Sequence, residues 1–269
     1  MPGVILAVLD DPDETPALLG AARCLAELSG GAAIHALIAR TPPQSTIVAT
    51  EEVLTRRRES AIRAQELARA AHLAAIFQDW APAMRGPSQL IDVEAIAAAA
   101  ITERGPGADF VVIGQSARRQ HGPGARAILA ALFDTDRPVL VVPPGCRQDF
   151  GRRIALAWRD DSRTIRAVLA AMRCLGHAER MLVLAGQREG AAPPRLPDIL
   201  EEHGVTAELV VLPLGGPEFG ETVLGKAHEL GADMLVMGAY AHDPVRDLVL
   251  GGLTKYMLSH CDLPLLMRH

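Results

Sequence analysis

The sequence predicts an α/β protein built from two similar units, each a doubly wound, five-stranded parallel sheet with helices on both faces. Three observations carry this prediction. Short apolar runs alternate with helical patterns along the whole chain. Several runs, such as Val111–Ile113 and Met234–Met237, are apolar throughout, which is typical of strands buried on both faces. The second half of the chain also repeats the first.

The repeat divides the chain into two predicted domains. The block AVLDDPDETPALLGAARCL begins at Ala7, and AWRDDSRTIRAVLAAMRCL begins 150 positions later at Ala157. They share Asp-Asp and Arg-Cys-Leu, and GADFVVIGQSA in the first half mirrors GADMLVMGAYA in the second. The proline- and glycine-containing segment PPGCRQDFGRR separates the halves. We therefore expect domains at residues 1–146 and 147–269, the first a degenerate copy of the second.

The first half opens with an apolar run at Val4–Leu9, followed by the helical pattern of the repeated block. Its second helix is longer than that of the other half and contains EEVLTRRRESAIRAQELARAAHL. Arg56–Arg58 are expected on the solvated side of this helix. One apolar stripe is predicted along it, made of Leu54, Ala61, Ala64, Ala68 and Ala71.

In the second half each element can be assigned in chain order from its apolar pattern. Strands are predicted at Arg153–Trp158, Met181–Ala185, Ala207–Leu212, Met234–Met237 and Pro264–Met267. Helices are predicted at Ser162–Leu175, Pro197–His203, Pro217–Leu230 and Arg246–His260.

Composition and charge exclude several classes of protein. The net charge is −5 with no block of like charges, and aromatic residues make up 3% of the chain, so neither nucleic acid nor an anionic membrane is an expected partner. The apolar run Val4–Leu9 is too short for a signal peptide or a membrane span, which favours a cytoplasmic protein. The four cysteines form no CxxC pair and are expected to be reduced and buried.

The loop after the fourth strand of the second half suggests an anion site. In a doubly wound sheet, ligands bind beyond the carboxyl ends of the strands. Gly238 ends one strand there, and Gly251 and Gly252 open the last helix, whose free N–H groups suit an anion. Asp160 or Asp161, at the end of the first strand of this half, could meet the polar groups of a nucleoside.

The spacing Gly238, two residues, Ala241, nine residues, Gly251, Gly252 resembles the nucleotide-binding signature of the universal stress protein family. That signature is Gly, two residues, Gly, nine residues, Gly, then Ser or Thr. The resemblance covers essentially the whole chain and includes GADMLVMGAYAH, LVLGG and the Leu-Pro before the last strand.

The resemblance implies a Rossmann-like strand order of 3-2-1-4-5 in each half and a dimer-like, pseudo-twofold pairing of the halves. It also implies a role in stress resistance, and ATP or AMP as ligand, with Mg²⁺ accompanying ATP. A homodimer is compatible with it. The site residues it indicates are Asp160, Gly238, Ala241, Gly251, Gly252 and Thr254.

The sequence departs from the family signature at three places. Ala241 stands at the second glycine, and Gly252 replaces the Ser or Thr, so that Thr254 would have to supply the hydroxyl. Arg159 stands where an acidic nucleoside contact is frequent, which displaces the carboxylate to Asp160. These departures leave two hypotheses open: an adenine-nucleotide-responsive stress module, or an interaction module with vestigial pockets.

Other motifs indicate no further site. GGPEFGET has Glu221 where a P-loop needs lysine, and HGPGARA follows its strand too late for a dinucleotide fingerprint. His260, Cys261 and His269 lack zinc-ligand spacing, and His242 is expected to face solvent. No catalytic acid, base or nucleophile is marked out, nor is a signature for adenylyl transfer. We therefore expect at most weak ATP hydrolysis.

Overall fold

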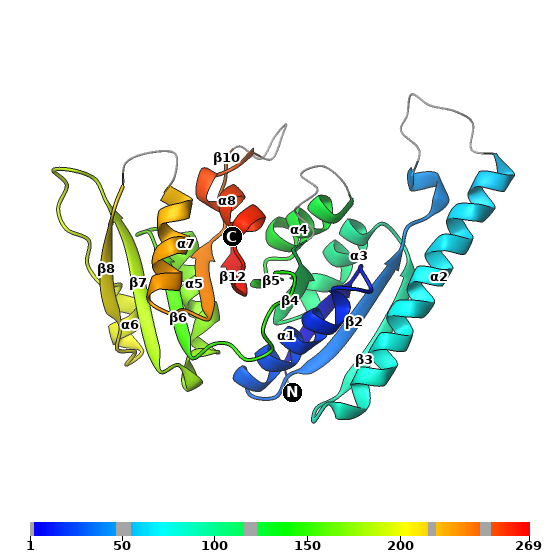
Figure 1. Ribbon diagram of the computed structural model, residues 1–269, viewed down its shortest axis with the longest axis horizontal. Helices are drawn as coiled ribbons and strands as arrows, with labels where there is room; N and C mark the ends of the chain where they lie inside the picture. Colours follow the sequence, from blue (N-terminus) through cyan, green and yellow to red (C-terminus); the bar gives the residue numbers. More distant parts are fainter. Residues whose placement is uncertain (1–2, 47–54, 116–122, 215–218, 243–248) are drawn as a thin grey trace.

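The computed structural model shows one continuous ten-stranded sheet covered by helices on both faces (Figure 1). It describes residues 3–46, 55–115, 123–214, 219–242 and 249–269. The strand order is β3-β2-β1-β4-β5-β12-β9-β6-β7-β8, so each half of the sheet has the order 3-2-1-4-5 counted in its own strands. The predicted α/β class and strand order are confirmed.

In the described residues the two halves contain the same succession of strands and helices, except that the second half also has the short strands β10 and β11. In the first half these are β1 (Val4–Leu9), α1 (Thr15–Leu28), β2 (Ala33–Arg40), α2 (Arg56–Trp80), β3 (Ser88–Glu94), α3 (Ala97–Arg104), β4 (Phe110–Gly114), α4 (Pro123–Asp134) and β5 (Val139–Val142). In the second half they are β6 (Arg153–Trp158), α5 (Ser162–Met172), β7 (Arg180–Gln187), α6 (Asp198–Glu202), β8 (Glu208–Pro213), α7 (Phe219–Glu229), β9 (Met234–Gly238), β10 (Ala241–His242), β11 (Val249–Leu250), α8 (Gly252–His260) and β12 (Leu265–Arg268).

The halves meet through their last strands. β5 and β12 pair antiparallel, with Leu140 opposite Leu266, whereas every other neighbouring pair in the large sheet is parallel. One antiparallel pair between two parallel sheets is the relation expected when a twofold rotation superposes one unit on the other. The two predicted sheets are therefore present and joined edge to edge (Figure 1).

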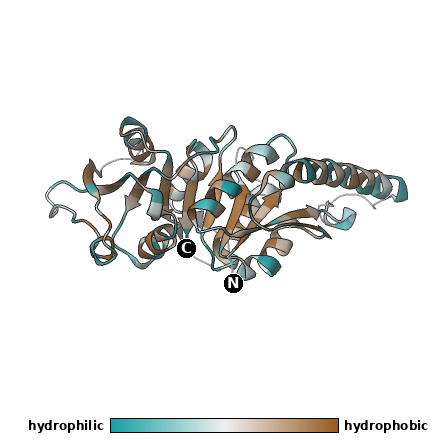
Figure 2. Cartoon of the chain, turned by 90° about the horizontal axis from the view of Figure 1, so that it is seen from below, coloured by the Kyte–Doolittle hydropathy of each residue, from teal (hydrophilic) through white to brown (hydrophobic). Residues whose placement is uncertain are grey.

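Two layers of helices cover the sheet. α1, α2, α5 and α6 pack on one face, and α3, α4, α7 and α8 pack on the other. The strands feed both cores because successive side chains point to opposite faces: Ile5 and Ala7 belong to one cluster, Leu6 and Val8 to the other. Figure 2 shows hydrophobic residues concentrated in the central strands between the helix layers.

The repeated Gly-Ala-Asp motif has a structural role in both halves. Asp109 accepts the backbone N–H of Val4 at 2.8 Å. Asp233 accepts those of Gly151 at 2.8 Å and Arg153 at 3.1 Å. Each carboxylate thus ties the start of the fourth strand of its half to the start, or the segment before the start, of the first. This repetition reflects the shared fold.

Side chains also connect the halves. The Gln115 amide donates to the carbonyls of Leu258 at 2.9 Å and Cys261 at 3.0 Å, at the carboxyl end of α8. Arg173, which follows α5, pairs with Asp109 of the first half at 2.7 Å. Gln115 of the first half therefore binds the last turn of α8 in the second half, and Arg173 of the second half binds Asp109 of the first.

The apolar stripe predicted for α2 is wrong. Ala61, Ala64, Ala68 and Ala71 are exposed, and Leu54 lies outside the described residues. The buried face is formed by Ala70, Leu73 and Phe77, all in the second half of the helix. Alanines gain little from burial, so the large side chains decide which face packs. Arg56, Arg57 and Arg58 are exposed, as predicted.

The start predicted for the last helix, at Arg246, is wrong in the described part of that segment. Val249 and Leu250 form β11, which pairs antiparallel with β10 in a two-residue ladder. The helix begins at Gly252, with Gly251 as its N-cap residue. Among the described helices, none is long and apolar enough to cross a membrane.

Candidate functional site

A cavity of about 800 Å³ lies at the carboxyl ends of β6, β7 and β9 in the second half. This volume is within the usual range of roughly 300–1,000 Å³ for ligand pockets. Its walls combine apolar side chains with charged residues and the first turn of α8. The lining includes Trp158, Arg159, Asp160, Leu184, Arg188, Arg195, Asp198, Leu214, Phe219, Met237, Tyr240, Gly251, Gly252, Leu253 and Thr254.

Asp160 is exposed and lines this cavity directly after β6. Its carboxylate makes no hydrogen bond or ion pair with any residue that the structure describes, so it can accept hydrogen bonds from a ligand. The neighbouring Arg159 also lines the cavity, and its side chain pairs with Asp161 at 3.2 Å. Asp160 thus lies at the edge of the sheet where the sequence predicts a ligand, with its carboxylate free to bind one.

Asp161 serves the protein itself. It is the N-cap of α5, and its side chain accepts the N–H groups of Arg163 at 3.1 Å and Thr164 at 3.0 Å. It also accepts the Tyr240 hydroxyl at 2.6 Å. Burial alone would raise the pKa of Asp161, but the hydrogen bonds from Tyr240 and Thr164 outweigh it and lower the pKa.

Tyr240, within the predicted glycine loop, joins this network. Its hydroxyl lies 2.6 Å from the Thr164 hydroxyl, and its ring faces the guanidinium of Arg159 at 5.3 Å. Burial, followed by the hydrogen bond to the Asp161 carboxylate, raises the pKa of Tyr240 to about 12. The loop is thus anchored to the start of α5 by a neutral phenol.

Gly238 is required by close packing. A Cβ at this position would lie 3.0 Å from the backbone nitrogen of Thr164 and 3.1 Å from the Tyr240 hydroxyl. Gly238 is buried and stands behind Tyr240, outside the cavity lining. The first glycine of the signature therefore lets the loop approach α5.

The polar groups at the start of α8 are divided between loop and cavity. The Gly251 N–H donates to the Tyr240 carbonyl at 2.9 Å, and the buried Thr254 hydroxyl accepts the Tyr240 N–H at 3.0 Å. Gly252, Leu253 and Thr254 follow the N-cap, so their N–H groups have no partner inside the helix. Gly252 is exposed and has open space where a Cβ would be.

Four of the six predicted residues therefore line one cavity: Asp160, Gly251, Gly252 and Thr254. Gly238 supports it from behind, and the backbone of Ala241 pairs with Leu250 in the β10–β11 ladder. The side chains of Ala241 and His242 lie outside the described residues. Whether the six residues bind a nucleotide stays a prediction.

Sequence reasoning missed Arg188 and Arg195 as candidate ligand contacts. Both line the cavity from the segment between β7 and α6. Arg188 could have been found from the sequence, because it directly follows the second strand of this half and that strand also ends at the ligand-binding edge of the sheet.

The two glycine motifs that were set aside as binding sites lie partly outside the described residues. Of GGPEFGET, residues 215–218 lie outside the description, and Gly220 packs against the Tyr256 ring. Of HGPGARA, residues 121 and 122 lie outside it, and α4 begins at Pro123.

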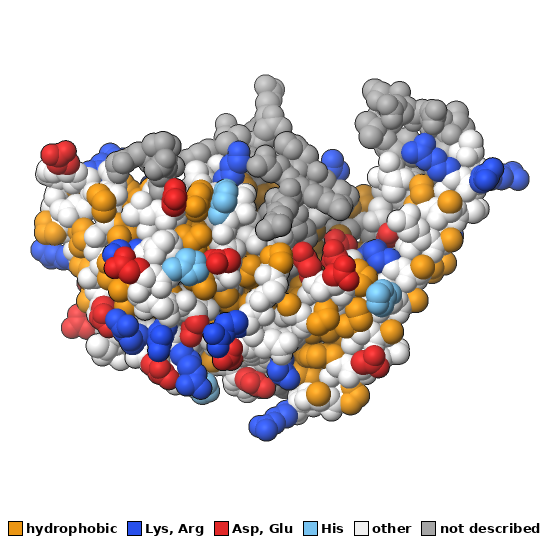
Figure 3. All heavy atoms as spheres, in the orientation of Figure 1, with side chains coloured by type: hydrophobic (Ala, Val, Ile, Leu, Met, Phe, Trp, Pro, Cys, Tyr) orange, Lys and Arg blue, Asp and Glu red, His pale blue; other side chains and the backbone are white. Residues whose placement is uncertain are grey.

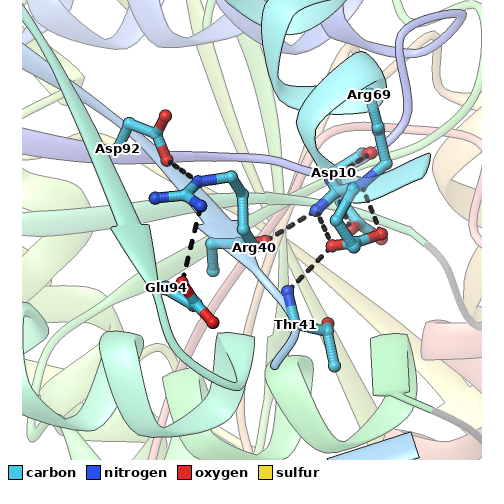
Figure 4. Close-up of polar contacts among 8 residues, drawn as sticks. Asp10, Arg40, Thr41, Arg69, Asp92 and Glu94 are labelled. Atoms are coloured by element: carbon cyan, nitrogen blue, oxygen red, sulfur yellow. Dashed lines mark hydrogen bonds and ion pairs between the residues drawn. The ribbon is translucent and has the colours of Figure 1, made fainter. Parts of the chain in front are cut away.

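The corresponding edge of the first half is filled by its own side chains (Figure 4). Arg69 of α2 donates to the carbonyls of Asp10 at 2.9 Å and Ala39 at 2.6 Å. It also pairs with Glu66 at 2.9 Å, and Glu66 accepts the N–H of Thr41 at 2.8 Å. Asp10 corresponds to Asp160 in the repeat. The long helix α2 therefore supplies groups that occupy the edge left open in the second half.

A pocket at this edge, formed by described residues of the first half, is small and acidic. Its volume is about 40 Å³, and its lining includes Asp10, Asp11 and Glu14. Burial, followed by repulsion from Asp11 and Asp10, raises the pKa of Glu14. Carboxylates packed this closely would repel a phosphate, so the first half offers no comparable anion site among its described residues.

No protein-family model and no curated protein matches the chain. Solved structures do match it. A universal stress protein from Archaeoglobus fulgidus DSM 4304 is 13% identical with a TM-score of 0.72, and the match covers 99% of this chain and 96% of that one. The chain has the universal stress protein fold.

Two structures from Pseudomonas aeruginosa share this universal stress protein fold. A putative universal stress protein from strain UCBPP-PA14 is 13% identical with a TM-score of 0.59, and the match covers 99% of this chain and 93% of that chain. A functionally unknown protein from strain PAO1 is 12% identical with a TM-score of 0.56, over 99% and 92% of the chains. The universal stress protein fold thus extends over both halves.

Proposed function

We propose that this chain is a tandem universal stress protein whose second half binds ATP or AMP and responds to it in stress resistance. The observation that supports this most is the asymmetry between the halves. A cavity of about 800 Å³ remains at the carboxyl edge of the second half, against about 40 Å³ in the first. Domains at 1–146 and 147–269 and a cytoplasmic location are part of the proposal.

The cavity offers groups that suit each part of an adenine nucleotide. Leu184, Leu214, Phe219 and Met237 provide apolar surface for the base. Asp160 can accept hydrogen bonds from ribose hydroxyls. The N–H groups of Gly252, Leu253 and Thr254, at the positive end of the α8 dipole, suit the phosphates.

Binding of Mg²⁺ in this cavity would require a bound nucleotide. No group of three or more His, Cys, Asp or Glu that could hold a metal ion is found in the part of the chain that the structure describes. Asp160 and Asp198 are the acidic side chains in the cavity wall. Because Mg²⁺ is commonly held by one or two carboxylates together with substrate phosphates, ATP itself would provide most of its ligands.

Thermal unfolding with millimolar ATP or AMP tests the proposal. Nucleotide binding to the folded state should raise the melting temperature of the wild-type protein. In Gly252→Val the new side chain enters the open space beside the amides of α8, so the shift should disappear while the unliganded protein stays folded. No nucleotide-dependent shift in the wild type would refute nucleotide binding.

An interaction module without a ligand is the second candidate, and one observation favours it. Two groups that the signature would direct at phosphate, the Gly251 amide and the Thr254 hydroxyl, already bond to the Tyr240 backbone. In that case the second-half cavity would be vestigial, and the surface of the paired halves would carry the function. Figure 3 shows acidic and basic side chains interspersed on one face, so a partner would not be selected by charge of one sign there.

A further inference from the structure

The charged side chains in the second-half cavity are not evenly distributed. Arg188 and Arg195 lie in the segment after β7, together with Asp198 at the start of α6. The N–H groups of Gly252–Thr254, at the start of α8, lie beyond β9. Because β6 separates β9 from β7 in the sheet, the strands that lead to these two regions lie two strand spacings apart, about 10 Å.

Arg188 and Arg195 are free to meet a ligand. Neither side chain makes an ion pair or a hydrogen bond with a residue that the structure describes. Two arginines within strands of the ten-stranded sheet do have acidic partners: Arg40 of β2 pairs with Asp92 at 2.7 Å, and Arg180 of β7 pairs with Glu208 at 2.9 Å. Two unpaired guanidinium groups in one cavity wall are a suitable binding site for a phosphate, which arginine can hold through two parallel hydrogen bonds.

The order of groups across the cavity specifies a ligand with two separated anionic groups. On the β9 side are the helix amides, which suit a 5′-phosphate. After β6, between these two regions, the lining holds the Asp160 carboxylate, which suits hydroxyls of the ribose, and Arg159, whose side chain is paired with Asp161. On the β7 side are Arg188 and Arg195. A ribose with phosphates on both sides has the same order of groups.

We propose that the cavity prefers an adenine nucleotide with a second phosphate on the 2′ or 3′ oxygen, bound by Arg188 and Arg195. This rests on the proposed function, since it takes the nucleotide to occupy this cavity. Arg188 and Arg195 would then select nucleotides by the position of the second phosphate on the ribose, and not only by the total negative charge. ATP has its additional phosphates on the 5′ side, away from the arginines.

Isothermal titration calorimetry of the full chain with AMP, ATP, adenosine 3′,5′-bisphosphate and adenosine 2′,5′-bisphosphate tests this. One of the bisphosphates should bind at least about tenfold more tightly than AMP, as expected for charge-assisted hydrogen bonds. In Arg188→Ala/Arg195→Ala the ratio of bisphosphate affinity to AMP affinity should fall to about twofold or less. ATP controls for charge, because its negative charge is similar to that of the bisphosphates.

Arg147→Ala/Arg152→Ala is the matched control. It removes the same charge from exposed arginines in the segment between β5 and β6, which are not part of the cavity lining, and should preserve the bisphosphate gain. If AMP binds and neither bisphosphate binds better, or the gain survives the Arg188/Arg195 change, the specificity proposal is wrong while nucleotide binding stands. If no adenine nucleotide binds, both proposals fail.

Discussion

Tyr240 shows how one side chain sets the geometry of the loop. Its hydroxyl bonds to Asp161 and Thr164 at the start of α5, and its backbone bonds to Thr254 and Gly251 at the start of α8. The loop after β9 is therefore attached to two helix N-termini at once. Tyr240 therefore fixes the position of the loop that borders the cavity.

The ionisation of Tyr240 should be visible in solution. The chain has two tyrosines, so ultraviolet absorbance can separate them by comparing the wild type with Tyr240→Phe. The component missing from the variant should titrate near pH 12, because burial and Asp161 raise the pKa of Tyr240 to about 12. A component titrating near pH 10, the ordinary tyrosine value of about 10, would contradict the network.

The same pKa predicts a dependence of stability on pH. The folded state holds the Tyr240 proton more tightly than the unfolded state does, so the stabilisation is complete below about pH 10 and is lost as the pH rises to about 12. Tyr240→Phe should lose less stability across that interval than the wild type does. Chemical unfolding at a series of alkaline pH values measures this, and parallel curves for the two proteins would refute it.

Gly238 and Gly252 should respond differently to alanine. Gly238→Ala places its Cβ at 3.0 Å from the Thr164 backbone, and such overpacking typically costs about 1–3 kcal/mol. Gly252→Ala enters open space in the first turn of a helix and should change the free energy of unfolding by less than about 0.5 kcal/mol. Urea unfolding compares the two, and equal effects would show that Gly238 is not packed as described.

At the scale of elements, the crossover between the second and third strands of each half decides which pocket stays open. In the first half it contains α2, Arg56–Trp80, whose Arg69 reaches the ends of β1 and β2. In the second half it contains only the short helix α6, Asp198–Glu202. The two halves share a topology but differ at this edge because the inserted helices differ in length.

Arg69 should therefore contribute to stability. Arg69→Ala removes its hydrogen bonds to two strand-end carbonyls and leaves Glu66 without its partner, so we expect a loss of about 2 kcal/mol in the free energy of unfolding. Arg63→Ala, on the same helix, breaks more exposed pairs with Glu59 and Glu94 and should cost about 0.5 kcal/mol. Urea midpoints measure both, and equal losses would contradict the role of Arg69.

The strands were the most predictable elements, for a physical reason. Strands buried on both faces are apolar without interruption, so the bounds predicted at Arg153–Trp158 and Met234–Met237 agree with β6 and β9 within one residue. The stripe on α2 was wrong because spacing alone does not weigh alanine against leucine and phenylalanine. The start of α8 was wrong because two residues before Gly251 pair with the loop instead of continuing the helix.

Part of the candidate site could be predicted and part could not. Asp160, Gly251 and Gly252 follow from the rule that ligands bind at strand ends and helix starts, and they do line the cavity. Two sets of hydrogen bonds could not be predicted: the Tyr240 N–H donates to the Thr254 hydroxyl, and Arg69 donates to the carbonyls of Asp10 and Ala39. Both join elements that are far apart in the sequence. Neither set of hydrogen bonds produces a local sequence pattern from which it could be predicted.

On the scale of the whole molecule, the two halves form one continuous structure. β5 and β12 share a ladder, Gln115 holds the end of α8, and Arg173 pairs with Asp109. These contacts do not require the covalent connection between Val142 and Arg153. The two halves are thus held together by strand pairing and side-chain contacts, not only by the connecting segment.

Cutting the connection should leave the halves together. A protease site inserted beside Gly145, which is exposed and has a φ of 68°, lies in the segment between β5 and β6. After cleavage, both fragments should elute as one complex, because the central strands stay paired through buried Leu140 and Leu266. Native mass spectrometry reports the outcome, and separation into free fragments would contradict the described interface.

The stoichiometry of nucleotide binding tests most directly whether only the second half binds a nucleotide. One open cavity in the second half, and a first-half edge filled by Arg69 and Glu66, predict one AMP or ATP per chain in isothermal titration calorimetry, abolished by Gly252→Val. No binding at all, two equivalents per chain, or unchanged binding in Gly252→Val would contradict a single nucleotide site in the second half.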